Sequence, residues 1–279
     1  MTFSRGLSLG LSWLWLALFS ILPLSIVLAI ALARPADTVP PFSFGFDPGN
    51  LAAAASDPLY RAALWLSLRT AAITTVGCLL IGYPMALAIA LMPERCRATL
   101  LLAMMLPFWT GFLMRINAWI GMLRDDGWIN GALVLLGFAP ARLLYTGAAL
   151  WIGMIYTYLP FMVLPVYARL AKLDPLLLEA AADLGASPLR AFLRVTLPLS
   201  VPGIAAGVAL VFIPATGEFV IPDLLGGPGA RLIGRVLWEE FFNNRDWPMA
   251  ASLAMLLLAS MVLLPLAAWR ILVRRGFAV

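Results

Sequence analysis

One acidic side chain lies inside a stretch of sequence that is otherwise apolar. Glu218 follows Pro214 by about one helical turn within the run 199–222. A charge inside a membrane span costs about 2.5 kcal/mol or more unless it is paired or hydrated, so this carboxylate is a candidate for binding a cation. Pro214 lacks an N–H, and we expect the helix to kink there. The alternatives are an ion pair with Arg115 or Arg69, or simple hydration at the outer surface.

Further residues could line a path for a cation near this carboxylate. Trp109 lies deep in another apolar run and can attract an alkylammonium through its ring. Tyr158 places a hydroxyl beside a proline kink, and Asp223 adds a carboxylate just beyond the run. With Glu218 and Arg115, these residues are the candidates for a substrate pathway. Packing in the protein core is the alternative for Trp109 and for Tyr158.

The composition excludes several kinds of catalysis. The sequence contains no histidine and two cysteines, Cys78 and Cys96. A Ser-His or Cys-His nucleophile is therefore impossible, and a zinc site would have too few ligands, so we expect no metal site. No nucleotide-binding motif occurs, so any ATP chemistry must come from another chain. The net charge of +5 does not indicate nucleic-acid binding, because the arginines are scattered between apolar runs.

The elements that carry these residues should be membrane-spanning helices. The chain is 63% hydrophobic and 12% charged, whereas soluble domains have roughly 45–50% and 25%. A span needs about 20 helical residues. We expect an all-α polytopic membrane protein, a single domain over 1–279, with six spans at about 9–33, 62–92, 98–123, 146–171, 199–222 and 248–273. The first run is too long for a signal peptide and is expected to remain as an anchor.

The distribution of charge predicts the orientation. With the N-terminus inside, the inner segments hold ten basic and four acidic residues, and the rest of the chain holds nine basic and ten acidic residues. Cytoplasmic loops of membrane proteins carry an excess of Lys and Arg. Both termini are therefore expected in the cytoplasm, together with the segment 174–198.

This inner segment is predicted to form two short helices joined at a corner. Asp174 favours the start of the first helix, and Gly185 suits the left-handed residue that ends it. Ser187-Pro188 favours the start of the second helix. Pro198 is expected to close this helix and to open the next apolar span. A compact helix–Gly–helix beside a membrane can dock in a partner's groove. An amphipathic loop resting on lipid headgroups is the alternative.

The segment resembles the EAA loop of ABC importer permeases. The shared pattern is Glu-Ala-Ala, three residues, Gly, nine residues, an aliphatic residue, one residue and Leu-Pro, with Val195 here in place of the usual Ile. In that family the loop is a coupling helix that sits in a cleft of the ATP-hydrolysing subunit. The resemblance assigns coupling to Glu179, Ala180, Ala181, Gly185, Ala186, Val195 and Pro198.

Other stretches are similar to polyamine importer permeases, most of all to the putrescine type. They include 107–110, 217–222 and 241–248. The resemblance implies a type I ABC importer permease fold in a bacterial inner membrane, with no catalysis and no cofactor of its own, since ATP and Mg²⁺ bind to the partner. It also implies a second, homologous permease, two ATPase subunits and a periplasmic or extracytoplasmic polyamine-binding protein. Alternatives are import of spermidine or another small solute and, more distantly, a channel or an intramembrane enzyme.

Overall fold

The computed structural model describes residues 2–274, apart from the side chains of residues 2–12, 264–269 and 271–274. Its regular structure in this range is helical except for a short hairpin, in which β1 (Arg34–Pro35) pairs antiparallel with β2 (Phe42–Ser43). The all-α fold class predicted from the sequence is confirmed. By their contacts the elements form two compact units: the first combines Met1–Trp65 with Ile233–Val279, and the second is Leu66–Leu232.

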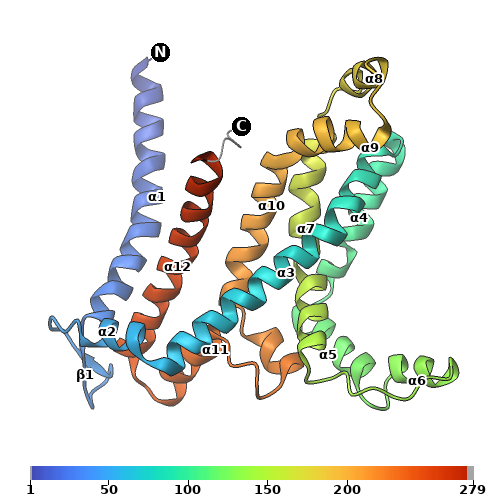
Figure 1. The fold of residues 1–279 in the computed structure, drawn as a ribbon. Helices are drawn as coiled ribbons and strands as arrows, with labels where there is room; N and C mark the ends of the chain where they lie inside the picture. The colour runs from blue at the N-terminus through green and yellow to red at the C-terminus, as the bar shows by residue number, and fades with distance from the viewer. Residues whose placement is uncertain (1, 275–279) are drawn as a thin grey trace. The chain divides into compact units, whose positions relative to one another are not determined.

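The first unit is built on α12 (Trp247–Arg274). Helix α1 (Thr2–Ala31) packs along α12, and the Ser252 hydroxyl donates to the Ala31 carbonyl at 3.3 Å (Figure 1). The unit also contains α2 (Gly49–Ser56), the first turns of α3 (Pro58–Leu91), α11 (Ile233–Trp238) and the π-helical turn η3 (Glu239–Asn243). A small apolar core joins these elements through Ala54, Ala63, Ile233, Val236 and Leu253.

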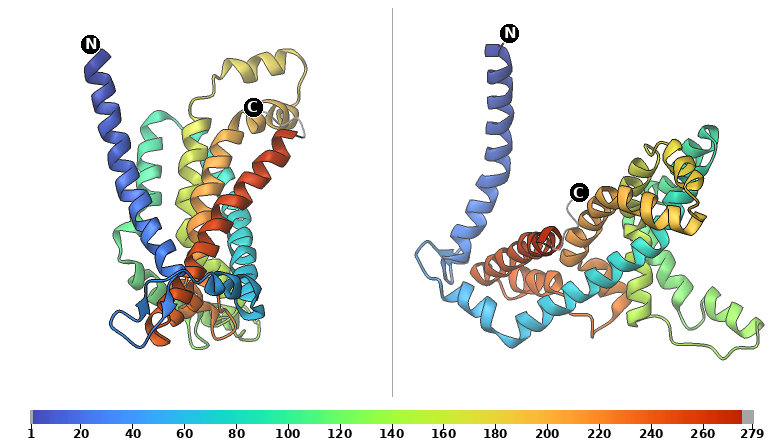
Figure 2. Two further views of the ribbon diagram at one scale, coloured as in Figure 1. Left: turned by 90° about the vertical axis from the view of Figure 1, so that its left-hand side faces the viewer. Right: turned by 45° about the horizontal axis from the view of Figure 1, so that its top comes forward.

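The second unit is built on two long helices, α7 (Gly147–Leu170) and α10 (Leu197–Gly217), which lie side by side in Figures 1 and 2. At one end of this pair lie α8 (Leu176–Asp183), α9 (Pro188–Ala191) and the π-helical turn η1 (Phe192–Thr196). At the other end lie α5 (Phe112–Leu123), α6 (Trp128–Leu135) and the π-helical turn η2 (Pro222–Gly226). The rest of α3 and α4 (Glu94–Trp109) complete the unit.

Two glycines allow α7 and α10 to touch along their backbones. A Cβ atom at Gly203 would lie 2.8 Å from the Pro165 carbonyl oxygen. A Cβ atom at Gly207 would lie 2.7 Å from the sulfur of Met162 and 3.3 Å from its Cα. Small residues permit such close approach between membrane helices, where packing rather than the hydrophobic effect drives association. The contact between these two helices forms the centre of the unit.

Four helices among the described residues are long and apolar enough to cross a membrane: Trp13–Ala31, Pro58–Leu91, Gly147–Leu170 and Pro188–Gly217. They overlap the predicted first, second, fourth and fifth spans. The sixth predicted span falls on α12, whose described apolar stretch, Trp247–Leu263, is shorter, and this span stays a prediction.

The third predicted span, 98–123, is not one helix. Helix α4 ends at Trp109, α5 begins at Phe112, and the helical segments on the two sides of this break meet at 88°. Pro107 removes a hydrogen bond from the last turn of α4. Arg115 reaches back across the break, and its Nη1 donates to the Pro107 carbonyl at 2.8 Å. This side-chain bond supports a bend that hydropathy alone does not indicate.

The fifth span begins earlier than predicted. Elements α9, η1 and α10 follow one another without a break as a 30-residue helix, Pro188–Gly217, which we call the rod. Pro198 lies in the first turn of α10 and so opens that helix as predicted, but it does not close the segment before it, because η1 runs into α10 without a break. The Leu197 N–H bonds the Phe192 carbonyl, five residues back, so the backbone before Pro198 already departs from the α-helical pattern that proline would interrupt.

Candidate functional site

The corner between α8 and α9 has the local structure that the sequence predicts. The Asp174 carboxylate accepts a hydrogen bond from the Leu176 N–H at 3.0 Å at the start of α8. Gly185 ends the helix with a φ of 77°, and its N–H bonds the Ala182 carbonyl at 2.8 Å. This left-handed conformation favours glycine because a Cβ is strained there. We call the segment 174–196, which runs from the start of α8 to the end of η1, the elbow.

The elbow presents apolar side chains to the outside. The exposed fraction is 89% for Leu184, 67% for Leu189 and 64% for Leu176. Of the predicted coupling residues, four are exposed and three are half-buried: Glu179, Ala180, Gly185 and Pro198, then Ala181, Ala186 and Val195. Several large apolar side chains exposed on one short segment are typical of a surface that another protein or a membrane covers.

The elbow is joined to the helices beside it mainly through η1. A cavity of about 790 Å³ lies between the elbow and the adjacent ends of α3 and α7, with Leu91, Arg97, Leu170, Leu178, Ala182 and Phe192 among its lining residues. The Phe192 ring packs edge-on against Tyr83 with centroids 5.8 Å apart. The Tyr83 hydroxyl lies 3.1 Å from that of Ser200 on α10. Helix α8 therefore projects from the unit, and η1 holds the elbow against α3 and α10.

Glu218 lies where the rod ends, and it serves as a helix cap. Its Oε1 accepts hydrogen bonds from the backbone N–H groups of Val220 at 3.0 Å and Phe219 at 3.1 Å. Its Oε2 accepts a hydrogen bond from the Tyr158 hydroxyl at 2.8 Å. A carboxylate at a helix start satisfies free backbone N–H groups. This capping explains how the chain becomes helical again between the end of α10 at Gly217 and η2. The same bonds hold the carboxylate against α7.

Neither arginine that the sequence offered as a partner pairs with Glu218. Among the described residues, the carboxylate has no cationic partner within 4.0 Å. The Arg115 guanidinium lies 4.8 Å from the centre of the Phe108 ring, and its buried Nε has no hydrogen-bond acceptor. The charge of Glu218 is therefore held by neutral donors.

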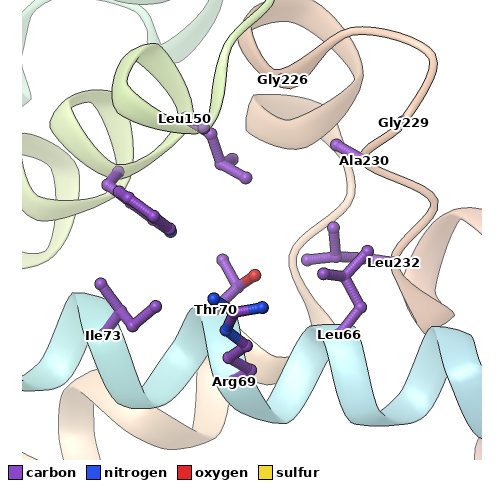
Figure 3. A pocket seen from close by; sticks show the side chains of 11 residues that line it. Leu66, Arg69, Thr70, Ile73, Leu150, Gly226, Gly229, Ala230 and Leu232 are labelled. Atoms are coloured by element: carbon purple, nitrogen blue, oxygen red, sulfur yellow. The ribbon is translucent and has the colours of Figure 1, made fainter.

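Arg69 lines a different cavity of the second unit, with a volume of about 260 Å³. Figure 3 shows Arg69 and Thr70 of α3 on one side of this cavity, and Leu150 of α7 and Ala230 on the other. Its walls are mostly apolar, and Arg69 has no ion pair among the described residues. This cavity does not include Glu218.

The structure joins some of the pathway candidates and leaves others apart. Tyr158 is 6% exposed and contacts Glu218 directly. Its ring centroid lies 6.2 Å from that of Phe161. The Phe161 ring in turn lies 5.6 Å from the Phe108 ring, over which the Arg115 guanidinium is placed. Sequence reasoning missed Phe108 and Phe161, because ring contacts between separate spans leave no pattern along the chain.

Trp109 and Asp223 lie at the surface of the second unit. Trp109 is 81% exposed beside the break between α4 and α5, so it is not a core residue of this chain. Asp223 is exposed in the first turn of η2. Among the described residues, no group of three or more Cys, Asp or Glu side chains could hold a metal ion.

Comparison with known proteins identifies the family. The sequence pattern of the binding-protein-dependent transport system inner membrane component matches residues 3–275. The spermidine/putrescine transport system permease protein PotB of Salmonella typhimurium (strain SL1344) is 43% identical over 259 residues, covering 92% of this chain and 89% of that protein.

Two crystal structures share the fold. A bacterial ABC transporter involved in the import of the acidic polysaccharide alginate matches with a TM-score of 0.77 and 17% identity, over 98% of this chain and 96% of that chain. A bacterial alginate ABC transporter in complex with an alginate pentasaccharide-bound periplasmic protein matches with a TM-score of 0.71 and 16% identity, over 98% and 94%. The resemblance to ABC importer permeases is confirmed, and the chain belongs to the family of binding-protein-dependent transport system inner membrane components.

Proposed function

We propose that this chain is one of two homologous permease subunits of an ABC importer that carries a polyamine, putrescine in the first instance, across a bacterial inner membrane. The name of its relative at 43% identity, a spermidine/putrescine permease, supports the class of cargo. Spermidine is the second candidate on the same ground. The preference for putrescine rests on the sequence resemblance described above.

The elbow is proposed to dock in a cleft of an ATPase subunit. The observation that carries this proposal is the set of exposed leucines on the elbow. The elbow is continuous with the membrane-spanning helix α10 through η1. A buried polar contact at Glu179 and close packing at Gly185 would transmit force. Two such ATPase subunits bind ATP and Mg²⁺, and this chain does no chemistry on either.

The proposed orientation places the elbow and both termini in the cytoplasm, with the two compact units acting as one permease domain. The excess of basic residues in the inner segments supports this orientation. The Glu218 end of the rod then faces outward, where an extracytoplasmic binding protein would deliver cargo. The alginate transporter that shares the fold is described in complex with a periplasmic protein, which supports a partner of that kind.

The proposed pathway passes Glu218, Tyr158 and the exposed ring of Trp109, with Arg115 holding the break beside Trp109 and Asp223 near the outer end. A flexible dication requires carboxylates for its ends and apolar or aromatic walls between them. A half-buried carboxylate that lacks a cationic partner among the described residues supplies the first requirement. The exposed ring of Trp109 supplies the second through cation–π attraction.

The test is purification of the permease after co-expression with its proposed partners. We expect two ATPase subunits and a second permease to co-purify, and putrescine with its binding protein to stimulate ATP hydrolysis in proteoliposomes. Spermidine, measured in parallel, decides between the two cargoes. A permease that recruits no ATPase, or whose complex responds to neither polyamine, would overturn the proposal.

A further inference from the structure

The rod connects the elbow directly to Glu218. Its 30 residues form one helix without a break, although η1 is π-helical and Pro202 and Pro214 lie inside α10. At about 1.5 Å per residue its course is roughly 45 Å long. Figure 1 shows α9 at one end of this course and the end of α10 at the other. Because successive turns of an unbroken helix are hydrogen-bonded to one another, a displacement of the elbow can be transmitted along α10 to the end that precedes Glu218.

The rod is positioned to shift against α7. Gly203 and Gly207 bring the two backbones into contact, and neither glycine has a side chain that could lock the rod to α7 at these points. Near the elbow the Arg169 Nε donates to the Leu199 carbonyl at 2.9 Å. Near the far end, the hydrogen bond between Tyr158 and Glu218 joins the helices. A shift of the rod would therefore separate the Glu218 carboxylate from the Tyr158 hydroxyl.

The two oxygens of Glu218 have different roles. Oε1 accepts the capping N–H groups of 219–220, which hold the carboxylate in place. Oε2 accepts one hydrogen bond, from Tyr158. A phenol leaves the negative charge uncompensated, and that is costly for a half-buried carboxylate. A primary ammonium carries a positive charge and three N–H donors, so it can bond Oε2 and the Tyr158 oxygen together.

We propose that Glu218 Oε2 and the Tyr158 hydroxyl form a binding site for one primary ammonium group of the cargo, which their own hydrogen bond closes in this structure and which movement of the rod opens. This inference rests on the proposed function of polyamine import. The capping oxygen keeps Glu218 positioned in both states. Tyr158 then has two roles: it binds the ammonium group in the open state, and it bonds to Glu218 in the closed state, so that its hydroxyl acts as a latch on the site. Bound cargo therefore opposes re-formation of the Tyr158–Glu218 hydrogen bond.

The experiment uses the complete complex in proteoliposomes, with its binding protein and putrescine. Glu218→Gln keeps an oxygen for the cap and removes the charge, and we expect putrescine uptake to fall at least tenfold. Tyr158→Phe removes the latch, and we expect basal ATP hydrolysis without cargo to rise about threefold and its stimulation by cargo to fall. The double variant should import no worse than Glu218→Gln alone, because the two residues act as one site.

Tyr156→Phe is the matched control on the same helix. Its ring packs against Trp119 with centroids 5.4 Å apart, and its hydroxyl makes no hydrogen bond among the described residues. Uptake and hydrolysis should both be normal in this variant. Unchanged uptake in Glu218→Gln, or unchanged basal hydrolysis in Tyr158→Phe, would overturn the inference.

Two further outcomes separate this inference from the proposed function. If Glu218→Gln or Tyr158→Phe fails to assemble with the ATPase, the pair is structural and the ammonium site is refuted. If the wild-type complex assembles but imports no polyamine, the proposed function fails before the variants are compared. Uptake by the wild type with normal uptake by Glu218→Gln refutes the site and leaves polyamine import intact.

Discussion

Replacing Gly203 by Ala tests the central contact between α7 and α10. The new Cβ would lie 2.8 Å from both the Pro165 carbonyl oxygen and the Arg169 Cβ, and 3.3 Å from the Val166 Cα. Two of these neighbours are backbone atoms, which cannot rotate away as the end of a flexible side chain can. The helices must therefore separate by some tenths of an ångström to admit one methyl group.

The expected cost follows from two opposing effects. Overpacking a well-packed core costs about 1–3 kcal/mol. A Gly→Ala change inside a helix by itself stabilises by about 1 kcal/mol. The net destabilisation at Gly203 should be about 1 kcal/mol, which lowers Tm by about 2–4 °C in a domain of this size class.

Gly131→Ala in α6 is the matched control. A Cβ at that position meets no atom within 4 Å, so the helical preference acts alone and Tm should rise by about 2–4 °C. Both variants are heated in detergent at one scan rate, and unfolding is followed by tryptophan fluorescence. The same chemical change should thus shift Tm in opposite directions. A rise in Tm for Gly203→Ala, like that of the control, would refute the close backbone contact between α7 and α10.

Three other variants test local features. Gly185→Val forces a branched residue into a left-handed conformation at a cost of about 1–2 kcal/mol. It should reduce polyamine uptake several-fold with a normal amount of the protein in the membrane. Gly185→Asn, which tolerates that conformation, should import normally. Equal uptake by the two variants would contradict the role of the corner. Asn130→Ala removes two hydrogen bonds, of 2.9 and 3.0 Å, to the Ala141 backbone, and should lower the free energy of unfolding by about 1–3 kcal/mol; an unchanged Tm would show that water replaces the amide. Arg115→Met removes the bond to the Pro107 carbonyl and should speed amide hydrogen exchange at the 110–111 break, with Arg115→Lys restoring protection; equal exchange in Met and Lys variants would exclude the tether.

The sequence by itself determined the features that depend on neighbouring residues. Hydropathy summed over about 20 residues locates a span, and four predicted spans overlap helices that could cross a membrane. The corner at Gly185 follows from local turn chemistry, and its φ of 77° agrees with the prediction. The family resemblance was carried by spacing along the chain, which requires no knowledge of contacts.

Tertiary structure decided which side chains meet. The spans are apolar on all sides, so no face of a helix indicates its neighbour, and the partner of Glu218 proved to be Tyr158, 60 residues away, rather than an arginine. Arg115 bridges the bend in the third span from the far side of the break. Pro198 continues a helix because the π-helical turn before it changes the hydrogen-bond pattern. These outcomes depend on helix rotation and on bonds between distant segments, which a one-dimensional pattern does not contain.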